Sequence, residues 1–399
     1  MAPLNISDRR ERLLVRAADL ALAPARLRRR RRPLERPRSI ICFRLERIGD
    51  LLMTLPALAE LHALAPTAAI DLVAGSWNAG IARAIPHIRS VEVLDARWLA
   101  RGTQGQTVKD LAVAARGWKS RGYDVAINFE PDIRSNVITA AVGARWTAGF
   151  ASGGGGPLLD FALPFDTTQH TADNMLALAR AVSRGWSDAP LAPDFHLQLD
   201  EDVRQRAAER LADLHSPIVA MHVAGGRAIK QWPQERFAEV ARWLAQERHA
   251  SVVLTGAAED RAANALVRAA MRPADALDVA GASLVEAAAI LERCDFLVTG
   301  DTGPMHLAHA VGTPVVAIFG PSDPQRYAPR GPRDRVVRVD LPCAPCNRIR
   351  QPPGRCVRAL HAGTAPDCLS GVTVAAVLAA IDDVIAGLGA DGDRISTVA

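Results

Sequence analysis

The chain has 399 residues, of which 49% are hydrophobic and 23% charged, enough apolar sequence for two globular domains. Its longest apolar runs are far shorter than the roughly 20 residues of a membrane-spanning helix, so we expect no transmembrane segment. The net charge of +5 is concentrated in the first forty residues, above all in arginines 26 and 28–32. These arginines are not interleaved with aromatic residues, so nucleic acid is not an expected partner.

Residues 1–38 read as a basic N-terminal extension. Arginines interrupt its apolar centre, which argues against a secretory signal and favours the cytoplasm. Two interpretations remain open: a basic amphipathic helix on an anionic membrane surface, drawing on residues 9–38, or a solvated extension. The first rests on apolar residues at roughly helical spacing with arginines between them: Leu13, Leu14, Ala17, Ala18, Ala21 and Leu22, against Arg9, Arg10, Arg12 and Arg16.

Strands and helices are then expected to alternate, which predicts a first Rossmann-like domain with a parallel sheet over residues 39–190. The expected strands cover residues 39–45, 70–74, 91–94 and 125–129, and a helix follows the first strand over 51–64. The glycine-rich run at 152–156 fits neither helix nor strand and predicts a mobile loop.

A second alternating series predicts another Rossmann-like domain over residues 191–371. Its expected strands are 218–223, 252–255, 277–279, 296–298 and 315–319, separated by helices at 233–246, 258–271 and 284–291. Residues 372–399 are expected to form a C-terminal helix and tail, the helix packing back on one domain. The predicted fold class is therefore α/β with two Rossmann-like domains.

Polar residues at the end of the first strand are candidates for acid–base chemistry. Asp50 could accept a proton from an incoming hydroxyl, or it could cap a helix that begins at Leu51. Arg44 and Arg47 flank the same turn, where they could hold an anionic acceptor or pair with nearby acids.

Strand ends of the second domain carry residues suited to a diphosphate. Gly225 and Gly226 allow close approach of the backbone, and Lys230 supplies a point charge. Neither a Walker A loop nor Gly-x-Gly-x-x-Gly is present, which disfavours a dehydrogenase. Asp301, Thr302 and Gly303 open a helix whose N–H groups suit a phosphate, with His306 about one turn further on.

A third strand end offers Glu259 and Asp260, which could bind ribose hydroxyls or favour the first turn of the next helix.

Cysteines form two groups. Cys42 and Cys294 are expected in the core. The later four could bind a structural zinc, although their irregular spacing favours ordinary reduced thiols over zinc, with disulfides the weakest option: Cys343, Cys346, Cys356 and Cys368.

Three blocks of sequence together resemble glycosyltransferase family 9, the heptosyltransferases related to lipopolysaccharide core assembly. They are Arg47-Ile48-Gly49-Asp50 through Thr54-Leu55-Pro56-Ala57-Leu58, Lys230-Gln-Trp232-Pro233, and Gly300-Asp301-Thr302-Gly303-Pro304-Met305-His306 with Phe319-Gly320-Pro321-Ser322-Asp323-Pro324. The late Cys-x-Pro-Cys also looks like a family feature. The extension before Ser39 lies outside the resemblance.

The resemblance implies a GT-B fold, two Rossmann-like domains facing across a cleft, with acceptor bound by the first and nucleotide sugar by the second. It implies transfer of a sugar, typically heptose from ADP-heptose, to a lipid-linked or other glycan, with inversion and without a required cofactor or catalytic metal. Asp50 then matches the general base and Lys230 the lysine that steadies the donor phosphates. The donor residues become Gly225, Gly226, Glu259, Asp301, Thr302, Gly303 and His306.

One departure from the family pattern is that Gly225 and Gly226 replace hydroxyl residues before the lysine, so phosphate contacts there would come from backbone amides. Rival interpretations are a GT-B transferase or epimerase that uses another nucleotide sugar, and a sugar-nucleotide-binding protein without turnover. The expected location is the cytoplasm, with peripheral contact to the inner face of the cytoplasmic membrane.

Overall fold

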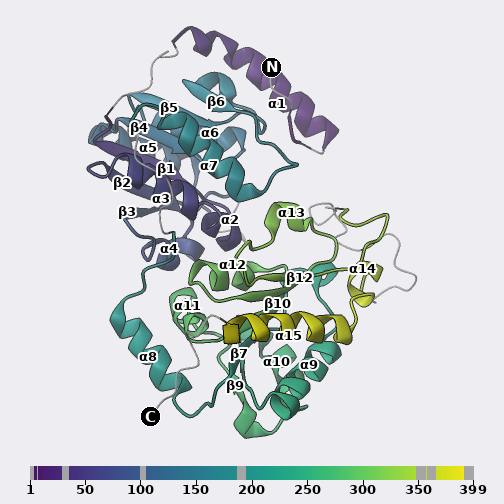
Figure 1. The fold of residues 1–399 in the computed structure, drawn as a ribbon. Coiled ribbons are helices and arrows are strands. Elements are labelled where there is room, and N and C mark those ends of the chain that lie inside the picture. Colours follow the sequence, from purple (N-terminus) through teal and green to yellow (C-terminus); the bar gives the residue numbers. More distant parts are fainter. Residues whose placement is uncertain are drawn as a thin grey trace. The chain divides into compact units, whose positions relative to one another are not determined.

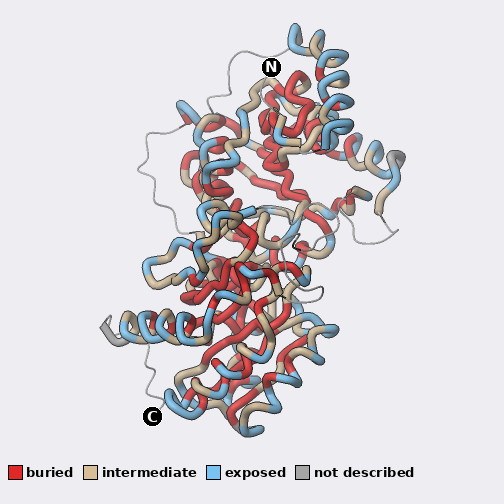
Figure 2. Tube along the Cα trace, turned by 90° about the vertical axis from the view of Figure 1, so that its right-hand side faces the viewer, coloured by how far each residue is buried: buried red, intermediate tan, exposed pale blue. Residues whose placement is uncertain are grey.

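The computed structural model describes residues 4–6, 8–28, 36–98, 105–186, 195–346, 356 and 365–390 (Figure 1). The chain divides into two compact units, Met1–Gln198 and Leu199–Ala399. Each unit contains a six-stranded sheet in which every pairing is parallel. Figure 2 shows buried chain in the interior of each unit and exposed residues on the helices around it.

The sheet of the first unit has the strand order β3-β2-β1-β4-β5-β6. Its strands are β1 (Ser39–Phe43), β2 (Ala69–Ala74), β3 (Ile88–Val93), β4 (Val125–Asn128), β5 (Trp146–Phe150) and β6 (Phe161–Leu163). The chain builds outward from β1 to β3 and then returns to the other side of β1, so the strand order reverses between β1 and β4. Ligands of open α/β sheets bind beyond the carboxyl ends of the strands at such a reversal.

The main helices that follow these strands are α2 (Ile48–Leu52), α3 (Leu55–Leu64), α4 (Ser76–Ala82), α5 (Val108–Arg121), α6 (Ile133–Ala141) and α7 (Thr171–Val182). Local sequence sets their ends. The side chains of Thr107 and Asp110 form a reciprocal capping box at the start of α5, and Gly122, with φ of 64°, ends that helix. Trp118 of α5 then packs edge-on against Phe43 of β1, with ring centroids 5.3 Å apart, which joins helix to sheet.

The second unit repeats the plan with the order β12-β11-β10-β7-β8-β9. Its strands are β7 (Ile218–His222), β8 (Ser251–Leu254), β9 (Ala276–Asp278), β10 (Phe296–Gly300), β11 (Val315–Ile318) and β12 (Arg335–Val337). Its longer helices are α8 (Glu201–Leu211), α9 (Gln234–Glu247), α10 (Arg261–Arg268), α11 (Leu284–Glu292), α12 (Gly303–Ala310) and α15 (Val374–Ala390). The strand order reverses between β7 and β10.

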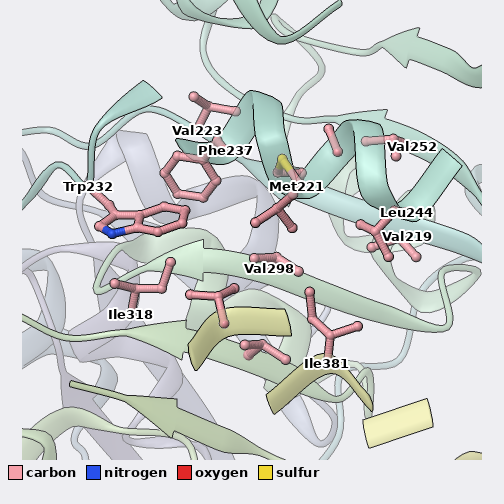
Figure 3. Packing of buried hydrophobic residues seen from close by; sticks show 14 of the residues in the cluster. Val219, Met221, Val223, Trp232, Phe237, Leu244, Val252, Val298, Ile318 and Ile381 are labelled. Carbon is pink, nitrogen blue, oxygen red and sulfur yellow. The ribbon is translucent and has the colours of Figure 1, made fainter. Parts of the chain in front are cut away.

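The C-terminal helix α15 packs into the hydrophobic core of the second unit. Figure 3 shows Ile381 of α15 in the same buried cluster as Ile318 of β11 and Trp232. The indole N–H of Trp232 donates to the backbone oxygen of Val372, 3.0 Å away, just before α15. The prediction that this helix packs back on a domain is confirmed, and it packs on the second.

Sequence patterns found the other strands but missed β5, β6 and β12, all of which lie at or next to a sheet edge. In β5 the misleading residue is Gly149, because glycine is uncommon in strands. A Cβ built there would lie 2.9 Å from Leu159 Cδ1 and 3.0 Å from Asn136 Oδ1. Only glycine lets those side chains approach the strand so closely.

The N-terminal extension forms a docked helix, α1 (Arg9–Leu22), so the description of a solvated extension is wrong for these residues. Val15 and Asp19 are buried, and the backbone N–H of Gly155 donates to Asp19 Oδ1 over 2.7 Å. The run at 152–156, expected to be a mobile loop, is buried against this helix. Arginines 29–32 lie outside the described residues. Among the helices that the structure describes, none is long and apolar enough to cross a bilayer.

Candidate functional site

The reversal in the first unit brings together charged residues from two neighbouring strands. Arg44 directly follows β1, Asp50 lies in the first turn of α2, and Glu130 follows β4 after one intervening residue. Because β1 and β4 pair in parallel, with Phe43 opposite Asn128, these residues emerge at the same edge of the sheet. The topology thus gathers an arginine and two acids at the place where a ligand is expected.

Arg44 organises this cluster. Its side chain is only 1% exposed. Nη2 lies 3.3 Å from Asp50 Oδ1, and Nε donates to the backbone oxygen of Asp50 at 3.0 Å. Nη1 donates to the backbone oxygen of Phe129 at 2.6 Å and lies 3.4 Å from Glu130 Oε2. Arg44 is thus buried and paired with nearby acids, the second of the two roles that the sequence left open for it.

Glu130 is the residue of this cluster that the sequence reasoning missed. It is 2% exposed, and its Oε1 accepts from the backbone N–H groups of Leu45 and Glu46 at 2.5 and 2.8 Å. Burial, and then the charge of Glu46, raise the pKa of Glu130 well above 4.5. Its place at the end of the predicted strand 125–129, beside the strand that leads to Asp50, was the available signal.

The carboxylate of Asp50 remains partly accessible, with its side chain 20% exposed. Helix α2 begins at Ile48, and its N-cap residue is Arg47, which makes no side-chain cap. Asp50 therefore lies inside the first turn, and the alternative that it caps a helix starting at Leu51 is wrong. An acid that is held by one buried arginine and open on one side has the geometry required of a general base. Arg47 is exposed beside it.

The reversal in the second unit gathers the residues predicted to bind a diphosphate. Lys230 ends a short 3-10 helix, η3 (Ala228–Lys230), after β7, and its ammonium forms an ion pair with Asp301 Oδ2 at the end of β10. The side chains are 20% and 8% exposed, respectively. A Cβ at Gly225 would lie 3.6 Å from Thr302 Cγ2, so the glycine loop adjoins the start of α12.

Helix α12 starts as the sequence predicts. Thr302 is its N-cap residue in an extended conformation, and no side chain caps the helix. The hydroxyl of Thr302 instead lies 3.1 Å from that of Thr299. The first N–H groups of α12, beginning at Gly303, therefore have no side-chain cap, which leaves them suited to an anion. His306 is buried one turn later, as is Asp301 before the helix.

The third predicted strand end follows β8. Asp260 Oδ2 accepts from the backbone N–H of Ala257 at 2.8 Å, so this acid is used by its own loop. Glu259 is exposed. Of the two acids that the sequence left open, Glu259 is the one free of that loop contact. His222, at the end of β7, is buried, and burial lowers its pKa, so its imidazole is neutral near pH 7.

The six cysteines separate as expected into core and late groups. Cys42 and Cys294 are buried, and burial raises the pKa of both thiols, which makes them unreactive core residues. Cys343, Cys346, Cys356 and Cys368 are all free thiols, the alternative that the sequence favoured over zinc, and within the described residues no group of three or more His, Cys, Asp or Glu side chains is arranged to hold a metal. Cys368 is buried in a short helix, and burial together with the charges of Cys346, Cys356 and Cys343 raises its pKa to about 11, so the four thiols lie near one another.

Comparison with known proteins gives the same family as the sequence motifs. The model of glycosyltransferase family 9 (heptosyltransferase) matches residues 113–355. Lipopolysaccharide heptosyltransferase 2 of Salmonella typhimurium is 28% identical over 73% of this chain and 85% of its own length. The lipopolysaccharide core heptosyltransferase of Haemophilus influenzae is 22% identical over 76% of this chain and 85% of its own length.

Solved structures agree on the fold. The glycosyl transferase family 9 structure from Veillonella parvula superposes with a TM-score of 0.74 at 24% identity, over 88% of this chain and 98% of its own. An E. coli ADP-heptose lipopolysaccharide heptosyltransferase II structure gives 0.71 at 22% identity, over 88% and 99%. The predicted α/β fold of GT-B type is confirmed. The chain therefore belongs to glycosyltransferase family 9 and is a glycosyltransferase.

Proposed function

We propose that this enzyme transfers heptose from ADP-heptose to a lipopolysaccharide-core or related glycan acceptor, with inversion at the anomeric carbon and without a catalytic metal. The named relatives are heptosyltransferases of lipopolysaccharide. The single observation that carries the mechanism is the pairing of Asp50 with the buried Arg44, which holds a partly exposed carboxylate at the end of β1.

Asp50 is the proposed general base. It takes the proton of the acceptor hydroxyl as the oxygen attacks the anomeric carbon, which breaks the bond to the diphosphate and inverts the configuration there. Arg44 fixes the carboxylate through its side chain and its backbone oxygen. Arg47, exposed at the same turn, is the proposed contact for an anionic acceptor.

The proposed donor site is the strand reversal of the second unit. As the bond to the sugar breaks, the diphosphate gains charge, and Lys230 together with the first N–H groups of α12 would stabilise it. Gly225 and Gly226 would offer backbone amides, and Asp301 would orient the lysine. Glu259 is the proposed ribose ligand, and Thr302, Gly303 and His306 complete the donor set.

We further propose that the acceptor is lipid-linked and that the enzyme meets it at the cytoplasmic face of the membrane, as a peripheral protein. The arginine-rich first segment supports this placement, because basic residues near an anionic lipid surface favour binding.

The function is tested by incubating the protein with ADP-heptose, with and without a heptose-deficient lipopolysaccharide core, and determining the configuration of the product. We expect transfer only when acceptor is present, with inversion. Thermal unfolding in the presence of ADP-, GDP-, UDP- and dTDP-sugars tests which nucleobase the donor carries. Stabilisation by non-adenine nucleotides alone would reject ADP-heptose and favour a family member that uses a different nucleotide sugar.

A further inference from the structure

The outward face of helix α1 combines exposed leucines with arginines. The four most exposed large hydrophobic side chains in the described part of the chain all belong to this helix and the 3-10 turn after it, η1 (Ala23–Arg28): Leu13 at 64%, Leu14 at 72%, Leu20 at 61% and Leu27 at 91%. Other exposed large hydrophobic residues are spread singly over both units. Leucines gathered on one face indicate an interaction surface.

The opposite face of α1 is fixed to the first unit. Val15 packs where any side chain at Gly154 would collide with it, and Gly154 has φ of 90°, a conformation that favours glycine. The hydrogen bond from Gly155 to the buried Asp19 holds the next turn. Asn5, before the helix, donates from its backbone to Ser152 and from its side chain to Phe165, both over 2.8 Å. The outward leucines are thus displayed by an anchored helix.

The charges on this face have one sign. Glu11 is exposed but lies on the docked side, because its charge adds to that of Asp132 in raising the pKa of Arg134 in α6. The other exposed residues of α1 are only arginine, leucine and alanine: Arg9, Arg10, Leu13, Leu14, Arg16, Ala17, Leu20 and Ala21. Arg26 is exposed in η1, and the sequence continues with further arginines.

We propose that this outward face of α1, with η1, is a docking surface for an anionic lipid membrane. The leucines would enter the boundary between head groups and acyl chains while the arginines contact anionic head groups, the arrangement of interfacial helices. The proposal rests on the proposed function in so far as a lipid-linked acceptor requires the enzyme at a membrane. It assigns the contact to the first unit, which also carries Asp50.

The test is co-sedimentation of the full chain with vesicles of phosphatidylcholine, or of equal parts phosphatidylcholine and phosphatidylglycerol. We expect binding to the anionic vesicles only, weakening as salt is raised. Each arginine near the surface multiplies the partition of the protein onto anionic vesicles by about five. The double variant Arg10→Gln with Arg16→Gln should therefore lower this partition about 25-fold. Leu13→Gln with Leu20→Gln should also lower binding. A matched control, Arg242→Gln with Leu266→Gln on exposed positions of the second unit, should bind like the wild type.

Equal binding of the wild type to both vesicles, or unchanged binding by the α1 variants, would overturn the proposal. So would a dimer that dissociates when Leu13 and Leu20 are replaced, since a second copy would then cover this face. Transfer to a delipidated, water-soluble acceptor separates the two hypotheses. If vesicle binding fails while that transfer is retained, only the docking surface is rejected; if no acceptor is glycosylated while vesicles are bound, only the proposed function is rejected.

Discussion

The two sheets reverse strand order in the same way, between β1 and β4 in the first unit and between β7 and β10 in the second, yet the side chains at the two reversals differ in kind. In the first unit a buried arginine holds three acids, of which Asp50 and Glu46 are partly exposed and Glu130 is buried. In the second, a partly exposed lysine is paired with a more buried acid. One topology thus presents a carboxylate in one unit and a cation in the other.

Arg44 and Lys230 differ in burial, and this difference suggests different roles: positioning another side chain for Arg44 and binding a ligand for Lys230. Arg44 is 1% exposed and its guanidinium contacts protein groups, so its proposed role is to position Asp50. Lys230 is 20% exposed, beside a helix start that no side chain caps, so its charge is available to a ligand. Variants at the first reversal should therefore lose the transfer step, whereas variants at the second should also lose donor binding, and this difference tests the comparison.

The largest effect is expected for Asp50→Ala, which should lower the rate of transfer by about 10²–10⁴ while leaving donor affinity nearly unchanged, because a general base acts in the transition state. Single-turnover transfer and calorimetric titration with the donor measure the two quantities. Asp50→Asn is the matched control, since its amide oxygen can still accept from Arg44 but cannot take a proton. Near-normal turnover in either variant would remove Asp50 from the mechanism.

Lys230→Ala should weaken donor binding and transfer together, with kcat/KM lower by about 10²–10³, because the leaving diphosphate loses its point charge. The same titration and transfer measurements apply. Lys230→Arg keeps the charge and the partner Asp301, so it should recover part of the donor affinity. If the alanine variant binds donor as tightly as the wild type does, the phosphate role of Lys230 is wrong. The strand reversal of the second unit would then no longer be the donor site that contrasts with the general base at the reversal of the first.

Glu130→Gln tests, through the pH dependence of stability, whether the buried carboxyl group beside Arg44 has a raised pKa. Because the pKa of Glu130 is raised above 4.5, the folded protein holds the proton more tightly than the unfolded chain does, and the ionised carboxylate costs stability once the pH exceeds 4.5. Glutamine cannot ionise. The free energy of unfolding of the variant, relative to wild type, should therefore rise on the order of 1 kcal/mol from pH 4.5 upward and then level off.

Urea denaturation at several pH values measures this difference. A difference that does not vary with pH would mean that Arg44 keeps Glu130 ionised over the whole range. Transfer by Glu130→Gln should fall far less than in Asp50→Ala, since the amide oxygen can still accept from the N–H groups of Leu45 and Glu46.

Sequence could predict what depends on local pattern. The alternation of strands and helices, the place of Asp50 in the turn and helix that follow β1, and the gathering of Lys230 and Asp301 at strand ends of the second unit all follow from periodicity and topology. The burial of Arg44 could not be read in this way, because it depends on Glu130 and Phe129, more than eighty positions away. Nor could the docking of α1, whose buried face is defined by Val15 and Asp19 against a distant glycine run, rather than by its more numerous leucines.

The smallest effect is expected for Gly225→Ala, which tests whether the donor reversal relies on its backbone. The added Cβ would lie 3.3 Å from Gln231 Cγ and 3.6 Å from Thr302 Cγ2, so a flexible glutamine must shift slightly and the cost in stability should stay below about 1 kcal/mol. Because the amides near Gly225 are proposed to approach the diphosphate, the donor KM should rise several-fold with kcat little changed. An unchanged KM in a stable variant would leave Lys230 and the start of α12 as the whole phosphate site, and the glycine loop would then serve only the packing around Thr302.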